Sequence, residues 1–399
     1  RRKCTTVVND LETRKSHPQL AAWLFSLAGM VAGMVTIGGI TRITRSGLSM
    51  TSWSITGSLP PISKEEWAKE FERYKTFPEF GSRPNMNVDD FKSIYFWEYS
   101  HRMLGRFVGI LFIAPFTYFS IRKMIPKRLY GRLGVLFSLG GAQGLIGWWM
   151  VKSGLDKGLV KDRVDNNQEV RVSSYRLATH LTMAFTTYVA LLWTALDCMN
   201  PLKIKDFASS VVLTKNQIGR FIGLRRVALL NGGLIFCTAV SGAFVAGNDA
   251  GRAYNTFPKM IEADVATPNG AWFPEKSVLL ELTPIYRNLF ENTATTQMNH
   301  RILALSTLTS VWAMYLPMRI SKNKPITPTN ITYKSLPRLT QIGLTAMAHV
   351  TVLQVSLGIA TLLNYVPTTL AVMHQAGSVL VLTMGTVLVY SLKFVKHLK

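Results

Sequence analysis

The chain has 399 residues, of which 48% are apolar and 17% charged, and 45 lysines and arginines against 22 acidic residues give it a formal net charge of +23. In a soluble protein this charge would indicate a nucleic-acid partner, but nucleic-acid binders are usually rich in charge throughout. Here the basic residues must lie between long apolar stretches. The composition therefore argues against a nucleic-acid binder and favours an integral membrane protein.

The three cysteines, Cys4, Cys198 and Cys237, are widely separated and form no Cys-x-x-Cys or Cys-x-x-Cys-His motif. Disulfide-rich domains, cysteine zinc sites and c-type haem attachment sites all need closely spaced cysteines. The sequence therefore argues against all three kinds of site.

Charge-free apolar runs recur along the chain, and a helix needs about 20 such residues to cross a bilayer. Two runs, at 107–121 and 302–318, become long enough if their helices begin near residues 93 and 288. Turn residues at 364–367 divide the last run into two spans. The sequence predicts an all-α integral membrane protein with eight transmembrane helices, at 19–40, 93–121, 133–151, 177–196, 227–248, 288–318, 339–363 and 368–392.

Charges are distributed unequally between the predicted spans. Five alternate segments carry a net charge of +20, whereas the four opposite loops carry +1. Lysine and arginine accumulate on the inner side of membrane proteins. We therefore expect an N-terminal tail at 1–18, a linker at 201–226 and a C-terminal tail at 393–399 on the cytoplasmic or matrix side.

The loop after the first span contains the pattern of a surface helix. Ser63 and Glu66 match a capping box, in which each side chain satisfies a backbone N–H group near the other residue. Trp67, Phe71 and Tyr74 then fall on one helix face. We favour an amphipathic helix that rests on the bilayer with this face over the alternative, a catalytic lid.

The second half of the chain repeats the first at a spacing of about 200 residues. Because four spans return the chain to the side on which it began, this pattern predicts two tandem pseudo-symmetric four-helix bundles, at 19–200 and 227–392. The matching positions, first half before second, are Glu98 and Gln297, His101 and His300, Arg102 and Arg301, Gln143 and Gln354, Gly147 and Gly358, and His180 and His374.

Four of the seven histidines, His101, His180, His300 and His374, are related by this repeat. A single intramembrane histidine is often a hydrogen-bonded packing residue, but polar groups are costly in a bilayer, and four at equivalent positions indicate a shared role. Neutral imidazoles on facing helices can supply both axial ligands of a haem iron. Zinc or copper would need more ligands close together. We therefore favour two haem sites, each formed by one histidine pair.

Glu98 lies one helical turn before His101, whereas the matching residue in the second half is Gln297, which cannot ionise. Placing a carboxylate within the membrane costs free energy, so its presence indicates a structural or functional role. Two interpretations stay open: an ion pair with Arg102 at i+4, or an acid/base group beside the first haem. The second interpretation places the chemistry in the N-terminal half and leaves the C-terminal haem as a redox or structural cofactor.

Several arginines lie near the expected outer ends of the spans, at the level where haem propionates would need cations. Extension of these side chains to the membrane interface is an equal alternative. The candidate cofactor-binding residues are Arg42, Arg102, Arg252 and Arg301.

Short motifs accompany these residues through most of the chain. They are Gly-Gly-Ile-Thr-Arg at 38–42, Ser-Gly-Leu-Ser at 46–49, Pro-Pro at 60–61, Trp-Glu-Tyr-Ser-His-Arg at 97–102, Gly-Ala-Phe-Val-Ala-Gly at 242–247, Asn-Thr-Phe-Pro at 255–258, Gln-x-x-His-Arg at 297–301 and His-Gln at 374–375. In combination they resemble the haem A synthases of respiratory membranes, over about residues 20–392.

The resemblance implies oxidation of the C8 methyl group of haem O to a formyl group, which gives haem A for cytochrome c oxidase. It implies that His101 and His180 bind the substrate haem O and that His300 and His374 bind a haem b cofactor. It also implies that Glu98 is catalytic, together with the first histidine pair. The alternatives are a di-haem b-type electron-transfer cytochrome that leaves its porphyrins unmodified, and a haem-delivery factor.

The resemblance also implies a setting. No cysteine lies in an expected outer loop, so the chain resembles the mitochondrial and related bacterial type. We expect a multi-pass protein of the mitochondrial inner membrane with both termini in the matrix, or of the plasma membrane in a bacterium. The implied partners are the farnesyltransferase that produces haem O, a ferredoxin-type electron donor, cytochrome oxidase assembly factors and the lipid bilayer. A homo-oligomer is compatible with the sequence.

Overall fold

The computed structural model of the chain describes residues 16–395, except 51, 55, 157, 159–169, 200–213, 266, 324–326, 328–330 and 394. The two expected tails, at 1–18 and 393–399, lie largely outside the described residues. So does the first part of the expected linker at 201–226.

The described part of the chain is helical and contains no strand, apart from an isolated bridge between Ile261 and Ala271. It contains eight long helices: α2 (Pro18–Ile43), α4 (Val88–Ile121), α5 (Lys127–Ser153), α7 (Ser174–Met199), α9 (Lys215–Gly247), α11 (Thr293–Ile320), α12 (Arg338–Leu363) and α13 (Thr368–Ser391). Among the described residues, seven helices are long and apolar enough to cross a membrane, and α11, with its polar first half, is not one of them. The all-α membrane class is confirmed.

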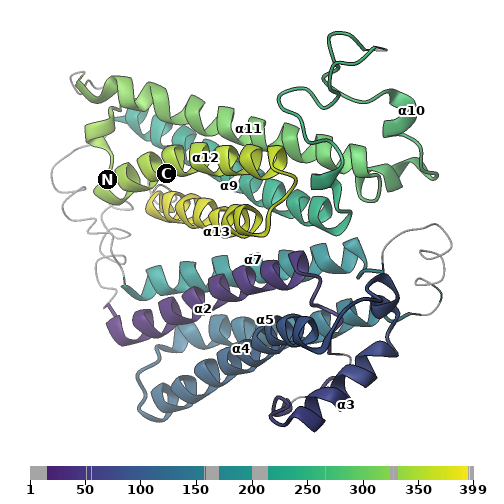
Figure 1. Ribbon diagram of the computed structural model, residues 1–399. Helices are drawn as coiled ribbons and strands as arrows, with labels where there is room; N and C mark the ends of the chain where they lie inside the picture. The colour runs from purple at the N-terminus through teal and green to yellow at the C-terminus, as the bar shows by residue number, and fades with distance from the viewer. Residues whose placement is uncertain are drawn as a thin grey trace.

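The eight helices pack in two groups. In the first four-helix group, α2 contacts α4, α4 contacts α5, α5 contacts α7, and α7 closes the ring against α2. The second four-helix group, α9, α11, α12 and α13, has the same order of contacts and is closed by α13 against α9. Figure 1 shows the first group below the second.

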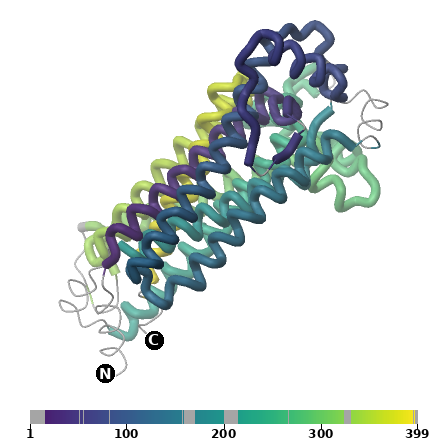
Figure 2. The backbone as a smooth tube through the Cα atoms, turned by 90° about the horizontal axis from the view of Figure 1, so that it is seen from below, coloured from purple at the N-terminus to yellow at the C-terminus, as the bar shows by residue number. Residues whose placement is uncertain are grey.

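Three helix pairs join the two groups: α7 with α9, α2 with α13, and α7 with α13. If each helix is replaced by the equivalent helix of the other group, the pair α7–α9 becomes α13–α2 and the pair α7–α13 is unchanged. A two-fold relation between the groups requires this pattern. Figure 2 shows that the long helices run side by side, and that α3 and the segment around residues 250–290 gather at one end of them. We call this end the outer end.

Four of the long helices begin five or more residues from the expected start, among them α5, which begins at Lys127 rather than at 133. α4 begins at Val88 rather than near 93, because Asn87 caps its first turn. α11 begins at Thr293 rather than near 288, where Asn292 is the cap. α9 begins at Lys215, inside the stretch expected to be a linker, because Thr214 forms a capping box with Gln217.

The surface helix after α2 is present as α3 (Lys64–Lys75), and its N-terminus carries the expected capping box. Its apolar face is covered by protein, so the expectation that this face rests on the bilayer is wrong. Phe71 and Tyr74 are buried and stack near Phe91 at the start of α4, with centroids 5.4 and 5.0 Å away. Trp67 meets Tyr95 edge-on. Amphipathicity predicts an apolar partner for a helix face but does not identify that partner.

Candidate functional site

Each of the four repeat-related histidines stands against a glycine of a neighbouring helix. A Cβ atom added at any of these glycines would lie 2.8–3.2 Å from Cε1 of the histidine, which is closer than side chains normally pack. Glycine therefore allows each ring to lie directly against a helix backbone. The four contacts are Gly38 of α2 with His101 of α4, Gly147 of α5 with His180 of α7, Gly242 of α9 with His300 of α11, and Gly358 of α12 with His374 of α13.

The structure brings together the histidines that the sequence paired. The rings of His300 and His374 have centroids 6.4 Å apart and planes at 90°. Two metal–nitrogen bonds of about 2 Å, together with the two ring radii, account for such a separation. His101 and His180 lie within electrostatic range of each other in the first group. These residues fit the two axial positions of a haem iron, whose remaining ligands come from the porphyrin.

The second histidine of each pair is also held by a glutamine. Nε2 of Gln143 donates to the backbone oxygen of His180 at 3.0 Å and lies 3.3 Å from Nδ1 of its ring. Gln354 repeats both contacts with His374, at 2.8 and 3.1 Å. The sequence marked Gln-x-x-x-Gly as a repeated motif without a role. The structure shows that its glutamine and its glycine flank one histidine ring.

Glu98 is 3% exposed, and among the described residues its carboxylate contacts Arg102, Ser49 and Met50. Oε1 pairs with Arg102 at 2.5 Å, while Oε2 accepts hydrogen bonds from the Ser49 hydroxyl at 2.7 Å and the Met50 N–H at 2.8 Å. The ion pair that the sequence left open is therefore present. The same carboxylate also fixes the segment after α2 to α4, so that its charge is held in place one turn from His101.

Gln297 occupies the matching position on α11 and is also 3% exposed. Its Nε2 donates to the backbone oxygen of Ala250 at 2.6 Å, in the segment that follows α9. Both side chains thus tie the end of the first helix of their group to the second helix. The first group does so with a charge that accepts hydrogen bonds, and the second with a neutral amide that donates one.

Arg102 and Arg301 both bind backbone carbonyl groups at the outer end. Arg102 donates to the oxygen of Met50 and, at 2.8 Å, to that of Ser52. Arg301 donates to the oxygen of Tyr254 at 2.8 Å. Both arginines therefore hold the segment that follows the first helix of their group.

Arg42 lies at the contact between the two groups. Its guanidinium donates to the oxygen of Ala246 at 2.6 Å and pairs with Asp249 at 3.0 Å, and Arg171 pairs with the other oxygen of Asp249 at 2.7 Å. Burial acts to raise the pKa of Asp249, but these two guanidinium groups outweigh it and hold the pKa below its ordinary value. Arg252, the fourth candidate, is exposed.

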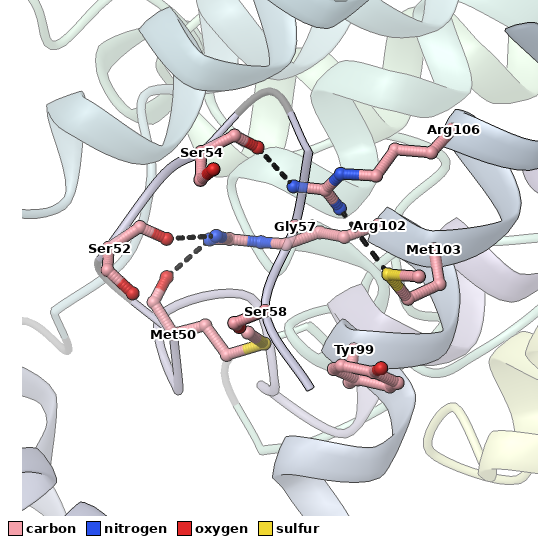
Figure 3. A pocket seen from close by; sticks show the side chains of 9 residues that line it. All are labelled: Met50, Ser52, Ser54, Gly57, Ser58, Tyr99, Arg102, Met103 and Arg106. Atoms are coloured by element: carbon pink, nitrogen blue, oxygen red, sulfur yellow. Dashed lines mark hydrogen bonds between the residues drawn. The ribbon is translucent and has the colours of Figure 1, made fainter. Parts of the chain in front are cut away.

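A pocket lies at the outer end between α4 and the segment after α2, as Figure 3 shows. Arg102 and Arg106 reach from α4 to the backbone of this segment, and Arg106 donates to the oxygen of Ser54. Gly57 has φ +84°, and a Cβ there would lie 3.1 Å from Nε of Arg106. The lining residues are Met50, Ser52, Ser54, Gly57, Ser58, Tyr99, Arg102, Met103 and Arg106.

Comparison with known proteins shows which family this chain is similar to. Residues 21–386 match the model of the COX15-CtaA family, which is described as a cytochrome oxidase assembly protein. The chain is 46% identical over 373 residues to Heme A synthase COX15 of Arabidopsis thaliana, covering 93% of this chain and 74% of that protein. It is 37% identical over 381 residues to Heme A synthase of Nitrosomonas eutropha, covering 95% and 94%.

A third relative joins two proteins in one chain. The Heme A synthase-mitochondrial ferredoxin fusion protein of Schizosaccharomyces pombe is 39% identical over 382 residues, which cover 93% of this chain and 60% of that protein.

Proposed function

We propose that this chain, which belongs to the COX15-CtaA family of cytochrome oxidase assembly proteins, is a haem A synthase that oxidises the C8 methyl group of haem O to a formyl group. The observation that carries the proposal is the repeated histidine pair. Glycines back the rings of both pairs, and Glu98 lies beside the first pair where Gln297 lies beside the second. Two copies of one site hold two porphyrins, and only the copy beside Glu98 has a group that can exchange a proton.

His101 and His180 are proposed to bind the substrate haem O, and His300 and His374 a resident haem b. Haem b, when bound, supplies one-electron redox chemistry. The glycines behind the rings let the imidazoles lie against the helix backbones, and the glutamines anchor the backbone of the second histidine of each pair. Arg102 and Arg301, which lie one residue after a histidine of each pair, remain proposed partners of the propionates. Arg42 at the end of α2 and Arg252 after α9 are the other two proposed partners.

Glu98 is proposed to act as a proton acceptor near C8. Two hydroxylations of the methyl group, with O2 as oxidant and electrons from a protein donor, give a geminal diol, and Glu98 takes a hydroxyl proton as the diol loses water to form the formyl group. Its carboxylate is oriented by Ser49, Met50 and Arg102. These contacts support the role because a base that is held in one position can meet its substrate without reorganisation. The neutral Gln297 cannot perform this step in the second group.

The protein is a multi-pass membrane protein, and we propose that α11 is the eighth span because it packs between α9 and α12 along with the seven apolar helices. The two groups would then be tandem parallel repeats with both termini on the inner side of the mitochondrial inner membrane. The charge difference of +20 against +1 between the two sets of connecting segments supports this orientation.

A ferredoxin-type protein is the proposed electron donor. The support is the Schizosaccharomyces pombe relative, in which a haem A synthase and a mitochondrial ferredoxin are one chain. The haem O-producing farnesyltransferase, cytochrome oxidase assembly factors and a second copy of the chain are the further proposed partners.

The test is to purify the full chain in lipid nanodiscs, supply haem O with reduced ferredoxin in air, and chromatograph the extracted porphyrins. We expect haem A to form while haem b stays unchanged. Recovery of haem b alone, with no haem A, would overturn the proposal and indicate a di-haem electron-transfer cytochrome.

A further inference from the structure

The first histidine of each pair has a different environment in the two groups. In the second group, Nδ1 of His300 lies 2.8 Å from Oγ of Ser241 on α9. The Ser241 hydroxyl donates its own proton to the backbone oxygen of Thr238 at 2.7 Å. Because that proton is used, the Ser241 oxygen must accept a hydrogen bond from Nδ1–H of His300.

This hydrogen bond determines which nitrogen of His300 is free. With the proton fixed on Nδ1, the lone pair is on Nε2, the nitrogen that can bind a metal. A hydrogen bond to the remote ring nitrogen also fixes the ring orientation and makes the ligand a stronger electron donor. Loss of such a contact typically lowers metal affinity about 10- to 100-fold.

In the first group, Nδ1 of His101 is buried and has no hydrogen-bond partner among the residues that the structure describes. The reason is one residue in the sequence. Ser241 directly precedes Gly242, which backs His300, whereas Ile37 directly precedes Gly38, which backs His101. Isoleucine has no group that can accept a hydrogen bond, so neither the tautomer nor the rotation of the His101 ring is fixed by that neighbour.

The other histidine of each pair does not show this difference. His180 and His374 both receive a glutamine amide on the backbone oxygen and beside Nδ1. Among the contacts of the histidine rings, the asymmetry therefore lies at the position of Ile37 and Ser241, and it stands beside the difference of Glu98 against Gln297.

We propose that Ser241 is a positioning residue that makes the C-terminal site retain its haem, and that Ile37 at the matching position leaves the N-terminal haem exchangeable. This inference rests on the proposed function for the presence of haem at both sites. A synthase needs this difference, because its substrate must enter and its product must leave while the redox cofactor stays. Tight, symmetric ligation at both sites would trap the product.

The experiment compares the reciprocal variants Ser241→Ala and Ile37→Ser in purified holoprotein. Apomyoglobin is added as haem acceptor, and the transfer of each haem type is followed by chromatography. We expect Ser241→Ala to accelerate loss of haem b about 10- to 100-fold and to shift its midpoint potential to more positive values. Ile37→Ser should slow release of haem O and haem A by a similar factor.

One control variant separates positioning from folding. Ser241→Thr keeps the hydroxyl group and should retain haem b as the unaltered protein does. Equal acceleration of both haems in Ser241→Ala, or unchanged release and potential in both reciprocal variants, would overturn the inference. Failure of the proposed function is a separate result, since it requires that the unaltered protein form no haem A from supplied haem O.

Discussion

The two four-helix groups share a scaffold and differ in a few side chains. In both, a glycine backs every histidine, an arginine follows the first histidine, and a glutamine contacts the second. They differ at Glu98 against Gln297 and at Ile37 against Ser241. The comparison teaches that two helix groups with the same order of contacts can present the same histidine arrangement beside different side chains.

At the outer ends too, the first group has buried carboxyl side chains where the second has buried amides. The first buries two carboxyl groups, Glu79 and Glu98, at 5% and 3% exposure, and the hydroxyl group of Tyr74 on α3 donates to Glu79 at 3.2 Å. The second buries the amides Asn288, Asn292 and Gln297. Carboxyl groups are thus buried at the outer end of the first group and amides at that of the second.

The largest effect is expected from removal of single histidines. His101→Ala should abolish haem A formation and leave haem b bound, whereas His300→Ala should remove haem b, because each variant lacks one proposed iron ligand of one site. Absorption spectra and extracted porphyrins measure both. His349→Ala is the matched control, because His349 is exposed and lies outside both pairs. Loss of both haems in either variant would show that the two sites are not independent.

Glu98→Gln gives the first group the residue of the second. We expect haem A formation to fall about 100-fold or more, the lower range for loss of a general base, with both haem spectra retained. The reciprocal Gln297→Glu should leave haem A formation dependent on Glu98. Normal turnover in Glu98→Gln would assign this carboxylate to the attachment of the 49–50 segment alone.

Gly358→Ala tests the close contact between a glycine and a histidine ring that occurs in both groups. The added Cβ would lie 2.8 Å from Cε1 of His374 and displace the ring, so we expect a loss of haem b affinity of about 10- to 100-fold. Gly33→Ala is the control, because no atom lies within 4 Å of its Cβ position. Titration of the protein with haem measures the difference, and equal affinities would contradict the role of glycine.

Glu79→Gln is expected to have the smallest effect on haem binding and turnover, and its effect on the free energy of unfolding depends on pH. Burial raises the pKa of Glu79 from 4.5 to about 7. The folded protein therefore binds an extra proton between these values, and stability falls as pH rises through this window. The glutamine variant avoids the penalty. It should be more stable than the unaltered protein by up to about 3 kcal/mol near pH 8 and equally stable near pH 4.5.

A control with the opposite sign comes from the second group. Hydrogen bonds from Arg287 hold the pKa of Glu291 below its ordinary value, so its ion pair contributes stability above the unfolded pKa and loses it as pH falls. Glu291→Gln should therefore lower stability near pH 8. Thermal unfolding in detergent at the two pH values measures both variants, and a pH-independent effect of Glu79→Gln would contradict the assignment.

The fold was predictable where it depends on local pattern. The helical class and most span positions follow from apolar run length, and the α3 capping box from residues three apart. The start of α9 was missed because four basic residues between Lys215 and Arg226 resemble a loop, although Thr214 and Gln217 carried the cap signal. The prediction that α3 rests on the bilayer was wrong because its apolar face packs against Phe91 of α4.

The histidine pairs and the Glu98 difference were visible in the sequence, because a repeat exposes equivalent positions directly. The glycine behind each ring was visible only as part of a motif, since nothing local shows which side chain a glycine faces. Ser241 was not visible at all. Its hydrogen bond to His300 joins residues 59 apart, and its significance appears only beside the unpartnered Nδ1 of His101.

By itself, the sequence determined the helical membrane class, the repeat and the residues able to ligate iron, because these depend on residue type and on spacing within a few turns. Only the tertiary structure decided what each buried polar group contacts. Arg42, expected near a propionate, reaches the backbone of Ala246, 204 residues away. Such contacts depend on how two helix groups pack, and a packed interior admits only those partners that the neighbouring backbone places within hydrogen-bond distance.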